Sequence, residues 1–169
     1  MSAGSIFLVG PMGSGKTAVG RCLAEELGRE FIDSDEAIES RSGVDIPFIF
    51  EREGEAGFRQ REAKVIDDLT QMPGIILATG GGTAQDPENR RHLRERGYVV
   101  YLHTSVDQQL KRTRRGRERP LLKTGDPREV LARLMEIREP QYREIAHLVV
   151  DTDGRKVSSV VREIRRNMP

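Results

Sequence analysis

The sequence predicts an α/β fold built on a mostly parallel sheet. Short runs of consecutive apolar residues, typical of strands covered on both faces, alternate with longer segments of helical character. Because parallel strands need crossover connections, this alternation indicates βαβ units with helices on both faces of the sheet. A chain of 169 residues is long enough for one domain with a full core, so we expect a single domain over residues 1–169.

The strands are predicted from their apolar content. Each strong candidate is a largely apolar run, too short for a helix and consistent with a buried strand. One shorter strand is predicted only because it lies between two helical segments. In chain order, the five predicted strands are 6–9, 30–32, 75–78, 98–102 and 147–150.

Two helix starts carry the same local signal. The segments 86–87 and 126–127 both read Asp-Pro, in which the aspartate can cap the helix and the proline suits its first position. Glu129 adds the acidic residue of a capping box to the second segment. A further helix is expected after Lys16, because apolar side chains recur there at helical spacing. Those side chains belong to Val19, Cys22, Leu23 and Leu27.

The composition excludes several classes of protein. With 28 basic and 27 acidic residues, the net charge of +1 does not suit a dedicated DNA-binding protein, and we expect no nucleic-acid partner. One cysteine cannot form an internal disulfide or a cysteine-based zinc site, which favours the cytoplasm. The early apolar run is too short for a signal peptide or membrane span, so no membrane partner is expected. We also expect a monomer.

Residues 10–17 read Gly-Pro-Met-Gly-Ser-Gly-Lys-Thr and fit the phosphate-binding pattern G-x-x-x-x-G-K-[ST]. Glycines let the backbone wrap closely, so that consecutive amide N–H groups point at phosphate oxygens, and the following helix adds its positive end. Lys16 is expected at the β- and γ-phosphates and Thr17 on magnesium. The alternative is a glycine-rich turn with a chance Lys-Thr pair, but a strand before and a helix after the motif favour the nucleotide site.

The chain lacks what other phosphate-loop proteins need. A guanine-binding GTPase carries an N-K-x-D segment, and neither of the two asparagines, Asn89 and Asn167, precedes a lysine. Motors and large ATPases need a longer chain. A small-molecule kinase fits the length.

Asp33 and Asp35 follow the second predicted strand. In an extended segment, both carboxylates would point to one side and could face the phosphates. One could hold magnesium through water while the other accepts the proton of a substrate hydroxyl, as phosphoryl transfer requires. The alternative is that Asp33 or Ser34 only caps a helix that starts near Glu36.

The segment 111–119 is rich in arginine, with six basic residues against one acid, Glu118. Its second half reads as a mobile loop because glycine and proline interrupt it. Such a loop is either a solvated face or a lid over something anionic.

Several motifs together resemble the shikimate kinase family. They occur in the order and at the separations usual in that family, and the resemblance covers nearly the whole chain. The phosphate loop alone is shared by many families, whereas the Phe-Arg, Gly-Gly-Gly and Arg-Pro-Leu-Leu motifs are far more selective. The matching segments are 10–17, 33–35, 57–62, 78–82 and 119–122.

The resemblance implies a fold and an activity. The fold is the three-layer P-loop NTPase fold, similar to nucleoside-monophosphate kinases, with a five-stranded, mostly parallel sheet flanked by helices. A substrate-binding region at about 33–62 and a mobile lid at about 112–125 are expected. The implied activity is the ATP- and Mg²⁺-dependent phosphorylation of the shikimate 3-hydroxyl, in the pathway to chorismate and the aromatic amino acids. ATP and shikimate are the implied partners.

The resemblance also assigns roles to residues. Asp35, Lys16 and Arg119 are implied in catalysis, with Asp35 holding the reacting hydroxyl and Arg119 reaching the transferred phosphoryl group from the lid. Asp33 is implied at magnesium through water, beside Thr17. Many members of the family have Ser-Thr after the lysine, whereas this chain has Thr17-Ala18. Thr17 still supplies the hydroxyl that magnesium needs. Arg112 and Arg155 are implied at the adenine. The implied nucleotide-binding residues are Gly13, Ser14, Gly15, Lys16, Thr17, Ala18, Arg112, Arg119 and Arg155.

A carboxylate-bearing substrate explains the remaining assignments. Arg59 and Arg138 match the family's shikimate-binding arginines, and an arginine fork binds a carboxylate with two hydrogen bonds. Taken alone, Arg59 reads as a surface residue of a charged helix and Arg138 as a helix-end cation. The implied shikimate-binding residues are Asp35, Arg59, Gly80, Gly81, Gly82 and Arg138.

Two other functions remain open from the sequence. Another small-molecule P-loop kinase, of the gluconate or nucleoside-monophosphate type, would share the fold and use Lys16 and Thr17 identically. A regulatory or RNA-binding module would use the arginine-rich segment 112–119. Aromatic residues make up only 5% of the chain, with no tryptophan, which disfavours base stacking.

Replacing Arg119 with alanine separates a catalytic arginine from a surface one. An arginine supplied to phosphoryl transfer contributes about 10³ to 10⁵ in rate, whereas a surface arginine changes the free energy of unfolding by about 0.5 kcal/mol at most. We expect Arg119→Ala to lower kcat by at least about 10³ with an unchanged urea midpoint. Near-normal turnover would remove Arg119 from the mechanism.

Overall fold

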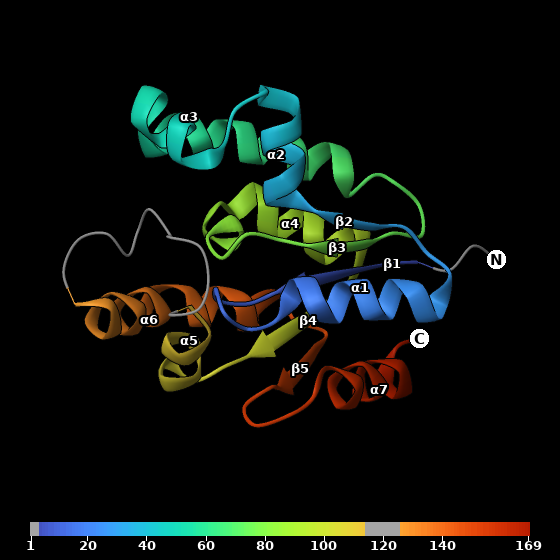
Figure 1. Ribbon diagram of the computed structural model, residues 1–169. Helices are drawn as coiled ribbons and strands as arrows, with labels where there is room; N and C mark the ends of the chain where they lie inside the picture. Colours follow the sequence, from blue (N-terminus) through green and yellow to red (C-terminus); the bar gives the residue numbers. More distant parts are fainter. Residues whose placement is uncertain (1–3, 114–125) are drawn as a thin grey trace.

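A five-stranded sheet organises the part of the chain that the computed structural model describes, residues 4–113 and 126–169 (Figure 1). All four strand pairings in it are parallel, in the order β2-β3-β1-β4-β5. Every predicted strand is present, and each observed end lies within one residue of its prediction. The strands are β1 (Ser5–Val9), β2 (Phe31–Asp33), β3 (Ile76–Ala78), β4 (Gly97–His103) and β5 (Leu148–Asp151).

The helices begin where the sequence signals them. Asp86 caps one helix by accepting a hydrogen bond from the Glu88 amide at 2.8 Å, and Asp126 caps another through the Arg128 amide at 3.1 Å. Within the described residues, no helix is long and apolar enough to cross a membrane. The helices are α1 (Lys16–Leu27), α2 (Ser34–Ser42), α3 (Ile46–Leu69), the short 3₁₀ helix η1 (Thr83–Gln85), α4 (Pro87–Arg96), α5 (Val106–Thr113), α6 (Pro127–Ile145) and α7 (Val157–Asn167).

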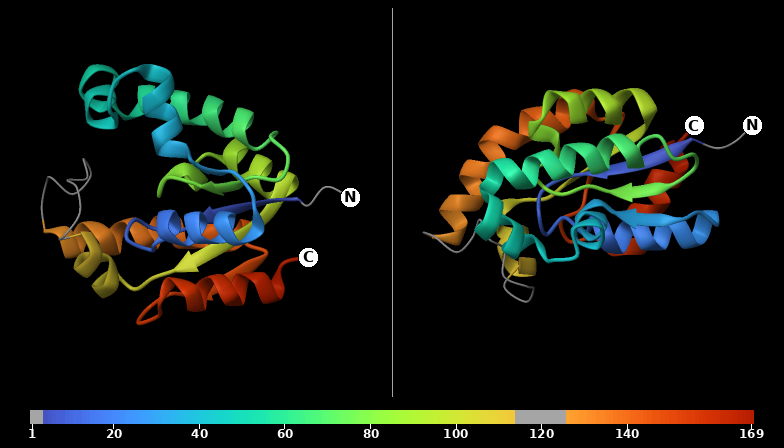
Figure 2. Two further views of the ribbon diagram at one scale, coloured as in Figure 1. Left: turned by 45° about the vertical axis from the view of Figure 1, so that its right-hand side comes forward. Right: turned by 90° about the horizontal axis from the view of Figure 1, so that it is seen from above.

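Helices cover both faces of the sheet (Figure 2), and each face carries its own core. Because side chains alternate along a strand, Phe7 and Val9 of β1 pack toward α3, α4 and α6, while Ile6 and Leu8 pack toward α1 and α7. All four side chains are at most 2% exposed. This two-sided burial produces the three layers, helix on sheet on helix, that the continuous apolar strands predict.

Parallel pairing brings the ends of the strands to one edge of the sheet. The register aligns Leu8 of β1 and Asp33 of β2 with the same residue of β3, Ala78. The segments that follow these strands are therefore neighbours: the glycine-rich loop 10–15 after β1, the start of α2 after β2, and the glycine triplet 80–82 after β3. In open α/β sheets, ligands bind outside this carboxyl edge.

Helix α3 contains a kink that divides it into two parts. Gly54 has φ of 71° and ψ of −177°, which interrupts the helical geometry. A side chain rarely adopts this region of backbone conformation, so the kink depends on glycine. The first part carries Ile46 and Phe50, and the second carries Phe58 and Arg59; all four line the cleft described below.

Gly54→Ala tests the kink. We expect the free energy of unfolding to fall by about 1–3 kcal/mol, because alanine is strained in this conformation. Urea denaturation measures the change. Gly4→Ala is the control, since Gly4 has open space around it and no positive φ, and it should stay within about 0.5 kcal/mol of the wild type. Equal stability of the two variants would show that the kink does not require glycine.

Candidate active site

A cleft of about 740 Å³ opens at the carboxyl edge of the sheet. Its walls come from the loop after β1, the start of α2, both parts of α3, the glycine triplet, α5 and α6. Most of the residues that the sequence assigns to a site line this one cleft, although they come from distant segments. They are Gly13, Gly15, Lys16, Thr17, Ala18, Asp33, Asp35, Arg59, Gly80, Gly81, Gly82, Arg112 and Arg138.

The glycine-rich loop is held in shape by left-handed glycines and by its own lysine. Gly13 and Gly15 have φ of 78° and 87°, so amide groups can turn inward where a side chain would be strained. The Lys16 ammonium donates to the Gly10 and Pro11 carbonyl oxygens at 2.7 and 2.8 Å. The cation therefore lies at the loop itself, where a bound phosphate would compete with these carbonyls for it.

Ser14 and Arg112 also support the loop. Ser14, assigned to nucleotide binding by the sequence, is only 1% exposed and lies inside the loop, with its hydroxyl 3.4 Å from the Lys16 ammonium. Helix α5 packs against the loop so closely that a Cβ on Gly13 would stand 3.2 Å from the Gln109 Cα. From the same helix, Arg112 donates to the Gly13 carbonyl at 2.8 Å.

Asp33 caps α2, which is one of the alternatives that the sequence left open, and it also contacts Thr17. One carboxylate oxygen caps α2 by accepting from the Asp35 and Glu36 amides at 2.8 and 3.3 Å, and the other accepts from the Thr17 hydroxyl at 3.2 Å. The expectation of an extended segment here is wrong, because this capping starts α2 at Ser34. Both aspartates still line the cleft.

The Thr17 hydroxyl and the Asp33 carboxylate form a pair of hard oxygen donors, as Mg²⁺ prefers. In the part of the chain that the structure describes, no group of three or more His, Cys, Asp or Glu side chains could hold a metal ion. In phosphoryl-transfer sites Mg²⁺ takes few ligands from the protein, because it keeps several waters and binds the substrate phosphates. The residues present therefore fit Mg²⁺.

The glycine triplet forms the floor on which three charged side chains converge. A Cβ on Gly80 would lie 2.8 Å from an Asp35 carboxylate oxygen, and one on Gly81 would lie 3.2 Å from the Arg138 guanidinium. A Cβ on Gly82 would overlap the Arg59 guanidinium. The absence of side chains at the triplet is thus what allows these three groups to meet.

Glu62 is a member of the site that the sequence reasoning missed. Its side chain is 1% exposed, and its two oxygens accept from the Arg59 guanidinium and from the Thr83 hydroxyl, each at 2.7 Å. A carboxylate buried this deeply needs such partners. The only sequence signal was its position three residues after Arg59 on a helix, where side chains meet.

Arg138 lies deeper in the protein than its sequence context suggests. The residue is 4% exposed, so it is not a solvated helix-end cation. Burial lowers the pKa of its guanidinium, the nearby Tyr142 opposes this shift, and the positive charge of Arg59 adds to it. An arginine stays charged even so. Among the described residues, the buried Nε atoms of both arginines lack a hydrogen-bond partner, although the Arg59 Nε lies 3.5 Å from a Glu55 carboxylate oxygen.

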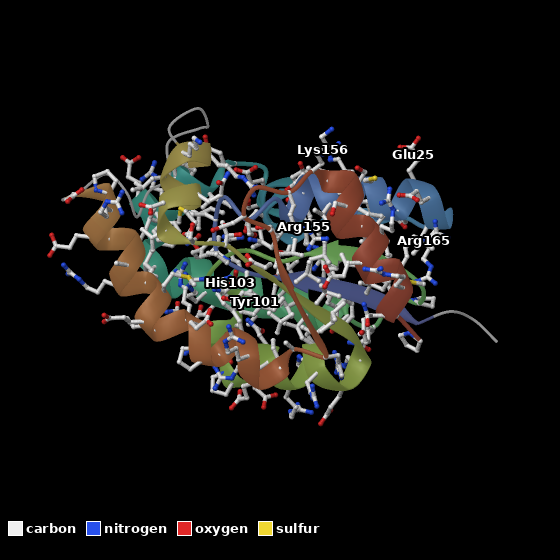
Figure 3. All side chains as sticks on the ribbon, turned by 90° about the horizontal axis from the view of Figure 1, so that it is seen from below. Glu25, Tyr101, His103, Arg155, Lys156 and Arg165 are labelled. Carbon is white, nitrogen blue, oxygen red and sulfur yellow. The ribbon has the colours of Figure 1, made fainter. Side chains whose placement is uncertain are left out.

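Besides Ser14, one described residue that the sequence assigns to the site does not line the cleft. Arg155 lies beside α7 (Figure 3), where its guanidinium pairs with Glu163 at 2.7 Å and donates to the Ser159 hydroxyl at 2.9 Å. Arg119, with most of the expected lid, lies outside the described residues.

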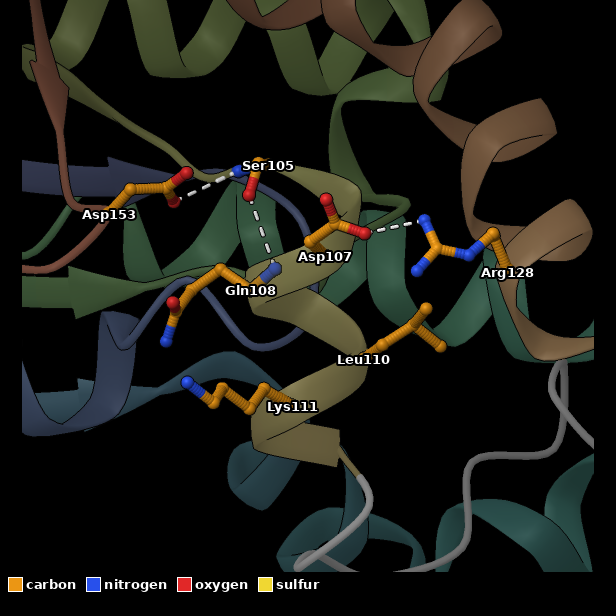
Figure 4. A pocket seen from close by; sticks show the side chains of 7 residues that line it. All are labelled: Ser105, Asp107, Gln108, Leu110, Lys111, Arg128 and Asp153. Atoms are coloured by element: carbon orange, nitrogen blue, oxygen red, sulfur yellow. Dashed lines mark hydrogen bonds and ion pairs between the residues drawn. The ribbon is translucent and has the colours of Figure 1, made fainter.

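A second, smaller hollow of about 460 Å³ lies between α5, the start of α6 and the segment after β5 (Figure 4). Two of its charged groups pair with each other, and a third accepts a hydrogen bond. The Asp107 carboxylate and the Arg128 guanidinium are 2.5 Å apart, and Asp153 accepts from the Ser105 amide at 3.1 Å. This hollow lacks the glycine loops of the main cleft, so of the two it is the main cleft that has the chemistry of a phosphate site.

The fold and the cleft define a kinase of the phosphate-loop class that acts on a small anionic molecule. The family model described as shikimate kinase matches residues 12–169. The chain belongs to the shikimate kinase family, whose members phosphorylate shikimate with ATP and Mg²⁺. It is accordingly an ATP-dependent kinase.

Named relatives agree with the family model. The chain is 54% identical to a shikimate kinase of Hahella chejuensis over 97% of its own length and 85% of that protein. Among solved structures, a shikimate kinase from Acinetobacter baumannii in complex with shikimate is 50% identical, with a TM-score of 0.94, covering 97% of this chain and 92% of that one. A shikimate kinase from Aquifex aeolicus is 33% identical, with a TM-score of 0.81 and coverages of 96% and 94%.

The alternative kinase class shares the fold only. A gluconokinase from Sinorhizobium meliloti is 23% identical, with a TM-score of 0.60, covering 95% of this chain and 88% of that one. A likeness at this identity reflects the common P-loop architecture, and it does not favour gluconate as the acceptor.

Gly82→Ala tests the converging floor. Gly82 has an ordinary φ of −99°, so alanine adds no backbone strain, but its methyl group would displace the Arg59 guanidinium. We expect the KM for shikimate to rise by about tenfold, equivalent to roughly 1.4 kcal/mol. The KM for ATP and the urea midpoint should change little.

Gly28→Ala is the matched control with the opposite pattern. Gly28 ends α1 with φ of 65° and has nothing near its Cβ position, far from the cleft. Alanine there should lower the free energy of unfolding by about 1 kcal/mol and leave both KM values unchanged. An unchanged KM for shikimate in Gly82→Ala would contradict the proposed contact.

Proposed function

We propose that this chain transfers the γ-phosphoryl group of ATP to the 3-hydroxyl of shikimate and acts as a cytoplasmic monomer on the route to chorismate and the aromatic amino acids. The observation that carries this proposal is the convergence of Asp35, Arg59 and Arg138 over a side-chain-free floor, in the same cleft as the phosphate loop. A small molecule with one carboxylate and one reactive hydroxyl fits this arrangement, because the carboxylate can bind the two arginines while the hydroxyl faces Asp35.

The phosphate loop binds the nucleotide. The amides of residues 13–18 donate to phosphate oxygens, aided by the positive end of α1, and Lys16 exchanges its loop carbonyls for the β- and γ-phosphates. Arg112 and Arg155 contact the adenine. The position of Arg112 against the loop supports its part, whereas Arg155 must leave its pairing with Glu163 to take this role.

Thr17 and Asp33 hold Mg²⁺, with Asp33 acting through water. The ion, when bound, neutralises the charge that develops on the phosphate oxygens. The capping bonds of Asp33 fix its carboxylate while its second oxygen stays turned toward Thr17, so the donor pair is oriented before a ligand arrives.

Arg59 and Arg138 bind the shikimate carboxylate, and the backbone of Gly80, Gly81 and Gly82 lines the ring. Asp35 accepts the proton of the 3-hydroxyl as that oxygen bonds to the γ-phosphorus, while the bond from this phosphorus to the β-γ bridging oxygen breaks and ADP leaves. Glu62 supports Arg59 by balancing its charge at 2.7 Å. This division of tasks suits phosphoryl transfer, which depends on positioning and charge neutralisation.

The chain forms one kinase domain over residues 1–169. Residues 33–62 act as the substrate-binding region, which is supported by the cleft-lining side chains of α2 and α3. Residues 112–125 act as the lid, from which Arg119 reaches the transferred group.

An assay of ADP release with ATP, Mg²⁺ and shikimate tests the function. We expect turnover that depends on shikimate and stops when the metal is chelated. Gluconate and nucleoside monophosphates serve as control acceptors. Phosphorylation of one of these, with none of shikimate, would decide for the alternative class.

Asp35→Asn tests the proton acceptor. The amide keeps the size of the side chain but cannot take the proton, so kcat should fall by about 10² to 10⁴. The far-ultraviolet circular dichroism and the KM for ATP should stay close to the wild type.

Glu36→Gln is the matched control for Asp35→Asn. Glu36 is the next residue, lines the same cleft and forms only an exposed ion pair with Arg21 at 3.5 Å. Its kcat should stay within about threefold, because exposed pairs contribute at most about 1 kcal/mol. Equal losses in the two variants would indicate a general effect on α2 and not a proton acceptor.

A further inference from the structure

A buried tyrosine lies directly beneath the proposed carboxylate site. Tyr142 is on α6, four residues after Arg138, so both side chains point from the same face of the helix. Its side chain is fully buried, and its hydroxyl donates to the Gly81 carbonyl oxygen at 2.5 Å. The phenol thus reaches the main chain of the glycine triplet from within the core.

The arginine lies against the same glycine. A Cβ on Gly81 would be 3.2 Å from the Arg138 guanidinium, and that guanidinium interacts electrostatically with the Tyr142 phenol. The hydroxyl and the guanidinium therefore meet at Gly81. Burial raises the pKa of Tyr142 far above its usual value, against the opposing charge of Arg138, so the hydroxyl keeps the proton that it donates to Gly81.

We propose that Tyr142 is a positioning residue for the substrate carboxylate, because its hydroxyl fixes the backbone of Gly81, against which the Arg138 guanidinium lies. Arginine has a long side chain with many rotamers, and a fixed guanidinium loses less freedom on binding than a free one. The bond to Gly81 fixes the position of the glycine-triplet backbone relative to that guanidinium. This inference rests on the proposed function, since it assigns Arg138 to the carboxylate of shikimate.

The surroundings of Tyr142 separate this role from plain packing. Its ring lies 5.0 Å from the ring of Tyr101, another fully buried tyrosine on β4. The Tyr101 hydroxyl points the other way and donates to Glu139, which also pairs with Arg143 at 2.5 Å. The two phenols therefore share a core, but of the two only Tyr142 bonds to the glycine triplet.

Tyr142→Phe is the test, because phenylalanine keeps the ring and removes the hydroxyl that bonds to Gly81. We expect the KM for shikimate to rise by at least about tenfold, with kcat and the KM for ATP within about threefold of the wild type. Tyr101→Phe is the matched control: it also removes a buried hydroxyl, and it should shift the urea midpoint while leaving the KM for shikimate unchanged.

The methyl ester of shikimate supplies a readout that a merely structural role would not move. The ester lacks the charge that Arg138 is proposed to bind, so its KM should be the same in the wild type and in Tyr142→Phe. The ratio of the ester KM to the shikimate KM should accordingly shrink by about tenfold in the variant. Equal rises for both substrates, or no rise for shikimate, would overturn the proposal.

Two outcomes separate this inference from the proposed function. If the wild type does not phosphorylate shikimate, the proposed function and the inference both fail. If it does, and Tyr142→Phe behaves as the wild type, only the inference fails. Should the variant not fold, a crystal structure of the wild type with shikimate decides: loss of the bond between the Tyr142 hydroxyl and Gly81 when the carboxylate is bound would overturn the proposal.

Discussion

The parallel pairing of β1 with β3 holds the phosphate loop next to the glycine triplet, and the geometry of the cleft depends on it. The two strands sit side by side at the centre of the sheet, with β2 on the far side of β3. Both central strands are fully covered by helices, so they cannot slip without exposing apolar side chains. A rigid sheet thereby fixes the distance between a phosphate donor and its acceptor, on which phosphoryl transfer depends.

The charged groups around the triplet balance one another without exhausting their hydrogen bonds. The positive charge of Arg59 lowers the pKa of Arg138, so the two guanidinium groups repel each other. Glu62 and Glu55 offset that repulsion, because both pair with Arg59. The Glu62 carboxylate is in turn buried only because Arg59 and Thr83 satisfy it. Both arginines line the cleft, so their guanidinium groups give this end of it a positive charge that suits an anion.

Structural and functional roles coincide in single side chains of this site. Asp33 starts α2 with one oxygen and meets Thr17 with the other, so the cap that forms the helix also orients the carboxylate that we propose for Mg²⁺. The Lys16 ammonium, proposed to bind phosphate, is held at the loop by two carbonyl oxygens. A group held by bonds within the protein needs little reorganisation when substrate binds, which favours catalysis.

The sequence by itself determined the features that depend on neighbouring residues. Apolar runs located four of the strands within one residue, Asp-Pro pairs located two helix starts, and the glycine pattern located the phosphate loop. These predictions succeed because helix capping, the alternation of side chains along a strand and left-handed glycine turns each depend on only a few neighbouring residues. The predicted extended conformation at 33–35 was wrong because Asp33 competes for the amides of the next turn and starts a helix there.

Only the tertiary structure decided which distant charges meet. Arg59 and Arg138 read as surface cations in the sequence, and the resemblance alone joined them; packing of α3 and α6 on one face of the sheet brings both to the triplet. Spacing gave no means of finding the burial of Glu62 or the reach of the Tyr142 hydroxyl to Gly81, nor of knowing that Arg155 pairs along α7. The physical reason is that such contacts depend on how whole helices pack, whereas a local pattern specifies only which face of a helix a side chain occupies.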